Sequence, residues 1–325
     1  MAGLFADLLG QPRAVALLEA SLERQRLAPA YLFAGADGVG RRLATLRFLE
    51  GVLVGPQRWS GGDPDLRRRL AAGNHPDLLW VEPTYQHQGR LVPHSEAQRE
   101  GVSRRSPPQM RLEQVREVSR FLARRPVEAP GCLVVLEGAE AMAEGAANAL
   151  LKTLEEPGAG MIILISAAPE RLLSTIRSRC QQIPFVRLSP ALVAQVLAGL
   201  PPDPAATIAA RADPAELLEL AAGSPGALLE HRHQWQALPE GLAERLLQLG
   251  RDPLEALALA RDLTEALDGE QQLWLLSWWQ LALWRRRGPG VDLARLERLR
   301  GQLLSYVQAR LAWEVALLEL AGCGG

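Results

Sequence analysis

The stretch that decides the fold is AYLFAGADGVGRR at residues 30–42, where a short apolar run leads into a glycine-rich turn. A helical pattern, RRLATLRFLEGVL, begins directly at residue 41. A buried strand, a glycine-rich loop and a helix in this order are typical of proteins in which strands and helices alternate. The stretch therefore predicts an α/β core with a loop that opens at the end of a strand.

Further apolar runs with strand character follow along the chain. They are DLLWVEP (77–83), CLVVL (132–136), MIILIS (161–166) and the edge sequence QQIPF (181–185). Helical patterns separate them, and unbroken apolar runs suit strands that are buried on both faces. The alternation over residues 30–187 predicts a parallel sheet covered by helices on both sides. Residues 84–110 have no apolar period, so we expect a long loop or insertion there.

After Leu188 the strand-like runs disappear. Residues 189–231 contain short helical stretches divided by proline-rich turns, and residues 236–321 have helical patterns throughout. We therefore expect three domains. They are an α/β domain at 1–187, a small helical domain at 188–232 and a helical C-terminal domain at 233–325.

Composition excludes several classes of protein. The 325 residues are 48% hydrophobic and 22% charged with a net charge of −1, which excludes a disordered chain and gives no overall attraction to nucleic acid or membranes. The richest apolar run, at 273–284, has about 12 residues where a membrane span needs about 20. The N-terminus has no signal-peptide pattern and the three cysteines form no CxxC pair. We expect a cytoplasmic protein without a membrane span or bound zinc.

The glycine-rich turn has the frame of a phosphate-binding loop, G-x-x-x-x-G-K-[ST], in which Lys contacts phosphate oxygens and the hydroxyl binds magnesium. Gly35, Gly38 and Gly40 fit this frame. Arg41 stands where the loop needs Lys, and Arg42 replaces the hydroxyl, so magnesium loses a ligand. Two interpretations stay open. The segment is either a plain strand–helix turn or a degenerate phosphate loop that binds ATP or ADP weakly, without hydrolysis.

Nucleotide hydrolysis also needs a carboxylate at the end of a buried strand to hold magnesium. The strand at 132–136 leads into Glu137, and Glu140 follows three residues later. This E-G-A-E spacing departs from the adjacent acids of an active site. The two residues are candidates for a degenerate acidic motif, and a chance pair of surface glutamates is the alternative.

Two motifs further along carry a family resemblance. NALLKTLEEP at 148–157 and SRC at 178–180, at this separation after a phosphate-loop frame, resemble the AAA+ subunits of bacterial DNA polymerase III clamp loaders, and more narrowly the delta prime group. The resemblance covers residues 1 to about 230 and includes NHPD at 74–77. It implies a RecA-like AAA+ domain, a helical lid and a C-terminal collar domain that joins a five-subunit assembly.

In that family the arginine of the SRC motif reaches the ATP of a neighbouring subunit. The resemblance implies that Arg179 is an arginine finger in trans, with Ser178 orienting it locally. A planar guanidinium stabilises the charge that spreads over a transferring phosphoryl group, so this role is chemically sound. A solvent-exposed surface charge is the plain alternative.

The sequence of the implied lid favours a subunit that has no ATPase activity of its own. Active relatives place an arginine after a Gly-Ser element to touch the γ-phosphate, whereas this chain has Gly223-Ser224-Pro225-Gly226 and no arginine. We expect an ATPase-deficient stator that is a component of the polymerase holoenzyme. The implied partners are a motor AAA+ subunit, the delta subunit and, through the assembled complex, the sliding clamp and primed DNA. No cofactor is required, and the four-cysteine zinc module of many relatives is absent from residues 55–75.

Rival interpretations remain at three places. The chain could be an autonomous AAA+ ATPase that uses Arg41 in place of lysine, or a scaffold in which Arg179 is unused. The tryptophans at 274–284 suit either a packed collar helix or an amphipathic helix on a membrane surface, and we favour the collar. Arginine clusters at 67–69, 104–105 and 124–125 are candidate phosphate contacts or solvated surface charges.

Overall fold

The computed structural model describes residues 3–55, 59, 62–97, 99–102, 107–156, 158–200, 213–288, 293–305 and 307–322. The described residues form two compact units, one chiefly of residues up to 200 with 223–226, the other chiefly of the remaining C-terminal residues. The three-domain division stays a prediction. Arg104, Arg105, Pro157 and Cys323 lie outside the described residues.

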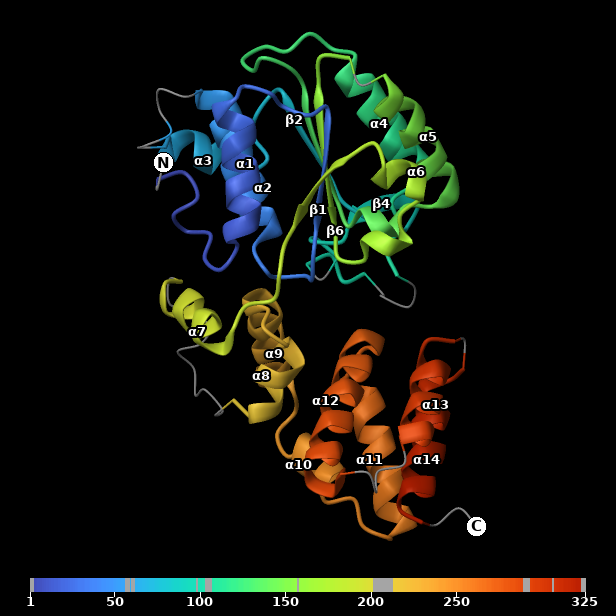
Figure 1. Ribbon diagram of the computed structural model, residues 1–325. Helices are drawn as coiled ribbons and strands as arrows, with labels where there is room; N and C mark the ends of the chain where they lie inside the picture. The colour runs from blue at the N-terminus through green and yellow to red at the C-terminus, as the bar shows by residue number, and fades with distance from the viewer. Residues whose placement is uncertain are drawn as a thin grey trace. The chain divides into compact units, whose positions relative to one another are not determined.

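A five-stranded parallel sheet forms the centre of the first unit, with the strand order β2-β5-β6-β1-β7 (Figure 1). The strands are β1 (Ala30–Ala34), β2 (Leu78–Val81), β5 (Leu133–Glu137), β6 (Met161–Ser166) and β7 (Gln181–Pro184). This sheet confirms the α/β prediction. Because all its strands are parallel, their C-terminal ends share one edge, where ligands bind in open α/β sheets.

Helices cover both faces of this sheet (Figure 1). The first set is α1 (Pro12–Glu23), α2 (Arg41–Val54) and α3 (Pro64–Ala71), and the second is α4 (Leu112–Leu122), α5 (Glu144–Glu155) and α6 (Ser174–Arg177). Tyr31 of β1 packs against Phe48 of α2, with 5.0 Å between ring centroids. Leu32, the next residue, lies in the buried cluster that includes residues of α4 and α5. Side chains therefore alternate between two buried faces, which explains the unbroken apolar runs.

The segment at 84–110 contains a β-hairpin, so the prediction of a long loop there was wrong in part. Strands β3 (Thr84–His87) and β4 (Arg90–Pro93) are antiparallel. Gln88 and Gly89 join them with φ of +49° and +81°, as a tight two-residue turn requires. A separate small core of Tyr85, Val92, Ala97 and Val102 stabilises the hairpin. Each strand buries too few apolar residues to give a period in the sequence.

The second unit is helical in its described part, as predicted. After α7 (Pro190–Ala198) of the first unit and α8 (Ala215–Ala221) come α9 (Pro225–Ala237), α10 (Leu242–Leu247), α11 (Pro253–Ala266), α12 (Gly269–Arg287), α13 (Leu293–Leu303) and α14 (Ala309–Leu320). Trp278 and Trp279 of α12 are buried, and they pack against Trp235 and Trp313. The tryptophan-rich run therefore builds the core of this unit.

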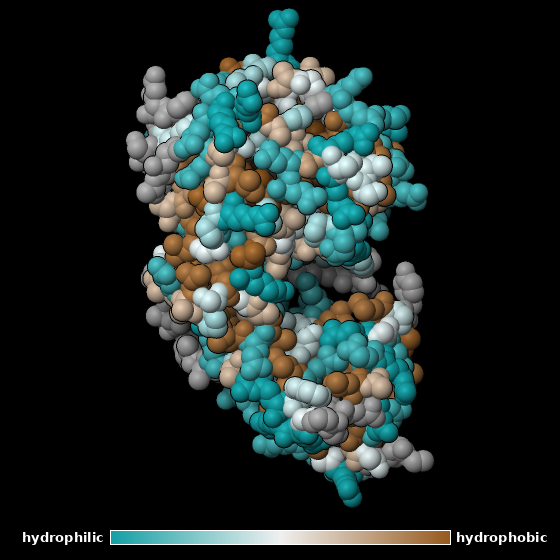
Figure 2. Space-filling view, viewed as in Figure 1, coloured by the Kyte–Doolittle hydropathy of each residue, from teal (hydrophilic) through white to brown (hydrophobic). Residues whose placement is uncertain are grey.

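None of the described helices combines the length and the apolar character that a membrane span requires. Hydrophilic and hydrophobic residues are interspersed over the visible face (Figure 2).

Candidate functional site

The glycine-rich loop lies between β1 and α2, at the C-terminal edge of the sheet. The N–H of Gly35 donates to the carbonyl of Ser166 at the end of β6, at 3.2 Å. Gly38 and Gly40 have φ of +72° and +101°, a region that residues with a Cβ rarely adopt. Gly38 and Gly40 therefore give the loop its shape, and a Cβ on Gly35 would clash with the carbonyl oxygen of Phe185.

Arg41 occupies the lysine position of the phosphate-loop frame. Arg41 is the first residue of α2, its side chain is only 7% exposed, and it forms an ion pair with Asp37 of the loop. Its Nε and Nη1 atoms make no hydrogen bond to any residue that the structure describes. A buried cation is stable only when it is paired with an opposite charge. Asp37 therefore neutralises the positive charge of Arg41 that would otherwise be available to bind a phosphate.

Arg42 occupies the hydroxyl position and contacts the acidic motif. Its guanidinium forms an ion pair with Oε2 of Glu137, at the end of β5, and lies 4.4 Å from the centre of the Trp80 ring. The Nε1–H of Trp80 donates to the same Glu137 oxygen at 2.8 Å. The carboxylate that would hold magnesium in an active enzyme is therefore occupied by the chain's own side chains.

Glu140 lies on the short 3₁₀ helix η2 (Ala139–Ala141) and has a different partner. Its Oε1 accepts the backbone N–H of Ala167, directly after β6, at 3.0 Å. The two predicted acids thus lie at the same edge of the sheet but serve separate contacts. Glu137 binds Arg42 of α2, and Glu140 holds the end of β6.

The Gly-Ser element contacts the loop backbone, which sequence reasoning missed. Ser224 Oγ donates to the carbonyl of Asp37 at 2.6 Å, and the N–H of Gly226 donates to the carbonyl of Gly38 at 3.0 Å. A Cβ on Gly226 would lie 2.6 Å from the Cα of Gly38, so only glycine fits this close approach. The glycines on either side of Ser224-Pro225 are the sequence feature that could have indicated this close backbone contact.

Gln11 is a second residue that sequence reasoning missed. It is buried, and its amide donates to the carbonyls of Val39 at 3.1 Å and Val186 at 2.7 Å. Its Oε1 accepts the N–H of Val186 at 2.9 Å. Gln11 therefore ties the loop to the segment after β7. A glutamine just before a helical pattern carries no signal of that contact.

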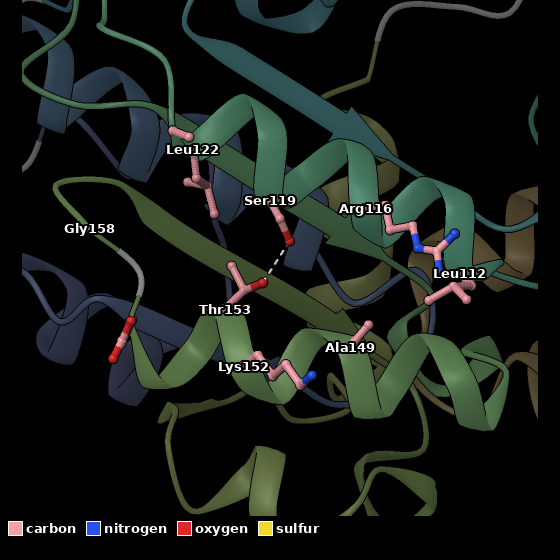
Figure 3. Close-up of a pocket in the computed structure, with 10 residues that line it drawn as sticks. Leu112, Arg116, Ser119, Leu122, Ala149, Lys152, Thr153 and Gly158 are labelled. Atoms are coloured by element: carbon pink, nitrogen blue, oxygen red, sulfur yellow. Dashed lines mark hydrogen bonds between the residues drawn. The ribbon is translucent and has the colours of Figure 1, made fainter.

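The hollow at the loop has a volume of about 240 Å³ and is lined by the loop, Glu137 and Ile165. Sites for drug-sized ligands usually measure about 300–1,000 Å³, so the hollow is small for a nucleotide. A larger groove of about 590 Å³ lies elsewhere, between α4 and α5. Arg116, Lys152 and Glu156 line it, and Ser119 and Thr153 hydrogen-bond across it at 2.8 Å (Figure 3). Its mixed charges specify no ligand, so the candidate site rests on the loop's chemistry.

Arg179 lies just after α6 and remains accessible, with its side chain 37% exposed. Its Nη1 donates to the carbonyl of Thr175 at 3.1 Å, and its Nη2 donates to Oε1 of Glu155 at 2.8 Å. Ser178 ends α6 as its C-cap and also donates its hydroxyl to Thr175, at 3.1 Å. The neighbouring Cys180 is buried, and burial raises the pKa of its thiol to about 12, so it is a packing residue.

Arg179 lies at the end of the sheet where the parallel strands begin, whereas the glycine-rich loop lies at the end where they finish. Gln181, at the start of β7, pairs with Tyr31 near the start of β1, whereas Gly35 follows the end of β1. From Tyr31 to Gly35 the strand rises by about 13 Å, which exceeds the length of an arginine side chain, and Arg179 precedes Gln181. The predicted finger and the loop therefore do not meet within one chain.

The described residues contain no cluster of three or more histidine, cysteine or acidic side chains able to hold a metal ion. Of the histidines weighed as ligands, His75 is buried next to Asp77, His87 ends β3 and His94 packs against Tyr85 at 5.9 Å. The absence of zinc stays a prediction.

The arginine cluster at 67–69 is paired within the chain. Arg67 binds the buried Glu50, Arg68 binds Asp65, and Arg69 binds Glu128. These pairs favour the interpretation of solvated or structural charges at this cluster.

Comparison with known proteins identifies the family to which the chain is similar. The family model for the "DNA polymerase III, delta subunit" matches residues 10–189, and that for the "Cyanobacterial DNA polymerase III delta prime, C-terminal domain" matches residues 191–320. The DNA polymerase III subunit delta prime of Bacillus subtilis is 35% identical over 185 residues, 55% of this chain and 49% of that protein. Its Pseudomonas aeruginosa counterpart is 36% identical over 206 residues, 62% of this chain and 55% of that protein. The chain thus spans about half the length of these curated relatives.

A solved structure shares the fold. The crystal structure of a DNA polymerase III gamma subunit-related protein from Thermotoga maritima has a TM-score of 0.55 and 17% sequence identity. The similarity covers 95% of this chain and 99% of that one.

Proposed function

This chain belongs to the DNA polymerase III delta prime family of clamp-loader subunits, and we propose that it is an ATPase-deficient stator that supplies Arg179 in trans to a neighbouring motor subunit. The motor would use ATP to open the sliding clamp and load it on primed DNA. In this proposal residues 1–187 are the AAA+ domain, 188–232 the lid and 233–325 the collar that joins the other subunits, including delta.

The position of Arg179 carries the proposal. The guanidinium is exposed at the end of the sheet away from the chain's own loop, so it does not reach a phosphate bound at that loop and is free to serve a neighbouring subunit. Phosphoryl transfer spreads negative charge over the equatorial oxygens, and an arginine supplied in trans stabilises that charge by orders of magnitude in rate. Ser178 supports this role by ending the helix that presents Arg179.

Three features of the loop support the absence of turnover by this chain. Arg41 replaces the lysine and is paired with Asp37, and Arg42 neutralises Glu137. The Gly-Ser element supplies backbone contacts to the loop in place of an arginine. Hydrolysis requires a free carboxylate for magnesium and a cation for the γ-phosphate. Here the carboxylate of Glu137 is paired with Arg42, and the cation Arg41 is paired with Asp37.

The test is the DNA- and clamp-stimulated ATPase rate of a reconstituted loader that contains either this chain or its Arg179→Ala variant, after both are shown to assemble equally. We expect a drop of about tenfold or more, equivalent to at least about 1.4 kcal/mol in the barrier. Arg171→Ala is the matched control, because Arg171 is an exposed arginine on the preceding turn, η3 (Pro169–Arg171). An unchanged rate with Arg179→Ala in an intact complex would leave only a scaffold role.

An autonomous ATPase is the second candidate, and one observation favours it. Arg41 keeps two buried nitrogen atoms without a hydrogen-bond partner among the described residues, as a phosphate-binding cation would. Magnesium-dependent turnover by the isolated chain, abolished by Glu137→Gln, would support this candidate. We expect no such turnover.

A further inference from the structure

We propose that Glu155 is a positioning residue for Arg179, which holds the guanidinium in the orientation that a neighbour's phosphate meets. The inference rests on the proposed function and adds a residue to it. Glu155 is the last residue of α5 and lies 24 positions before Arg179 in the sequence. Its role comes entirely from the ion pair that the fold creates.

The geometry holds the guanidinium on two sides. Nη2 of Arg179 donates to Oε1 of Glu155 at 2.8 Å, and Nη1 donates to the carbonyl of Thr175 at 3.1 Å. The carbonyl belongs to α6 and the carboxylate to α5, so two separate helices fix one side chain. A free arginine samples many rotamers, and restraining it before the phosphate arrives lowers the entropic cost of reaching the reactive geometry.

The pair leaves enough donors for a phosphate. A guanidinium has five N–H groups, and the two contacts use two of them. The Nε–H and one N–H on each terminal nitrogen remain for phosphate oxygens, so Arg179 can bind a neighbour's phosphate while Glu155 still holds it. Glu155 therefore acts as a support and does not have to be displaced.

Folding stability does not account for the pair. The side chains of Arg179 and Glu155 are 37% and 53% exposed, and ion pairs with this exposure contribute little to stability because water screens them. Removing the Glu155 carboxylate should leave the fold and the complex intact. The expected consequence is confined to how Arg179 is oriented.

Glu155→Gln in the reconstituted loader tests the proposal, with Glu156→Gln as the matched control. Glu156 is the next residue, is exposed, and makes no ion pair with any residue that the structure describes. Both variants remove one negative charge from the end of α5. We expect Glu155→Gln to lower the kcat of the stimulated ATPase by about three- to tenfold with the KM for ATP unchanged, because the arginine acts in the transition state. Glu156→Gln should match the wild type.

A double variant separates positioning from other effects. In the Arg179→Ala background, Glu155→Gln should cause no further loss, because the residue that it positions is gone. An equal additional loss there would overturn the proposal, as would a Glu155→Gln rate equal to the Glu156→Gln rate. A rate above wild type would also overturn it, since Glu155 would then restrain Arg179 from acting. Failure of Arg179→Ala itself to lower the rate is a different outcome and refutes the proposed function.

Discussion

Asp77→Asn should destabilise the first unit strongly. Asp77 directly precedes β2, is 2% exposed, and its carboxylate receives three backbone N–H groups from the turn at 127–129. Oδ1 accepts from Val127 at 2.8 Å, and Oδ2 accepts from Glu128 at 2.6 Å and Ala129 at 2.8 Å. This carboxylate binds the loop before β5 to the start of β2. Strands β2 and β5 carry Trp80 and Glu137, which hydrogen-bond to each other.

The magnitude follows from the donors that asparagine cannot satisfy. Its amide oxygen can replace one carboxylate oxygen, but its NH₂ group then faces at least one backbone N–H. Leaving one partly buried donor unpaired costs about 1 kcal/mol, the low end of the range for a buried group, and each of the two remaining bonds loses its charge assistance, about 1 kcal/mol apiece. We expect the free energy of unfolding to fall by about 3 kcal/mol at pH 7, a large part of the about 5–15 kcal/mol typical of domains.

The effect should depend on pH with a definite sign. Burial alone would raise the pKa of Asp77, but the three N–H bonds and nearby His75 outweigh it and lower the pKa below its usual value. As pH falls below about 4, the unfolded chain takes up this proton first, so the wild type loses the stability that the carboxylate contributes. The asparagine variant has no proton to bind there, and the gap between the two proteins should narrow.

Urea unfolding from pH 7 down to pH 3 measures this difference, with Asp65→Asn as the control. Asp65 is an exposed carboxylate that pairs with Arg68, so its variant should stay within about 0.5 kcal/mol of the wild type. A loss below about 1 kcal/mol for Asp77→Asn at pH 7, or a gap that widens in acid, would refute this account of the carboxylate.

Gly226→Ala should lower the free energy of unfolding by about 1–3 kcal/mol, because its Cβ would lie 2.6 Å from the Cα of Gly38. The urea midpoint checks this, and Gly145→Ala, whose Cβ meets no atom within 4 Å, should leave it unchanged or raised. Equal midpoints for the two variants would contradict the close approach. Cys180 should resist iodoacetamide at pH 8 in the native protein and react after unfolding in urea, because burial raises its thiol pKa to about 12. Peptide mass spectrometry measures the labelling, and rapid native alkylation would show that the thiol is accessible.

The order of elements along the chain could be read from the sequence because it depends on local patterns. Apolar runs such as 132–136 and 161–166 are continuous because both faces of those strands are covered. The glycines at 35, 38 and 40 and the SRC motif were also visible as short-range patterns. The hairpin in 84–110 escaped prediction because each of its strands contributes so little to a small core.

Which side chains meet was decided only by the tertiary structure. Arg42 reaches Glu137 across 95 positions, and Ser224 reaches Asp37 across 187, because the strand order brings distant loops to one edge of the sheet. The parallel pairing of β7 with β1 places Arg179, which precedes β7, beyond reach of the loop that follows β1, and no spacing in the sequence predicts this. Sequence periodicity reports which face of an element is buried, whereas contacts between side chains depend on how the elements pack.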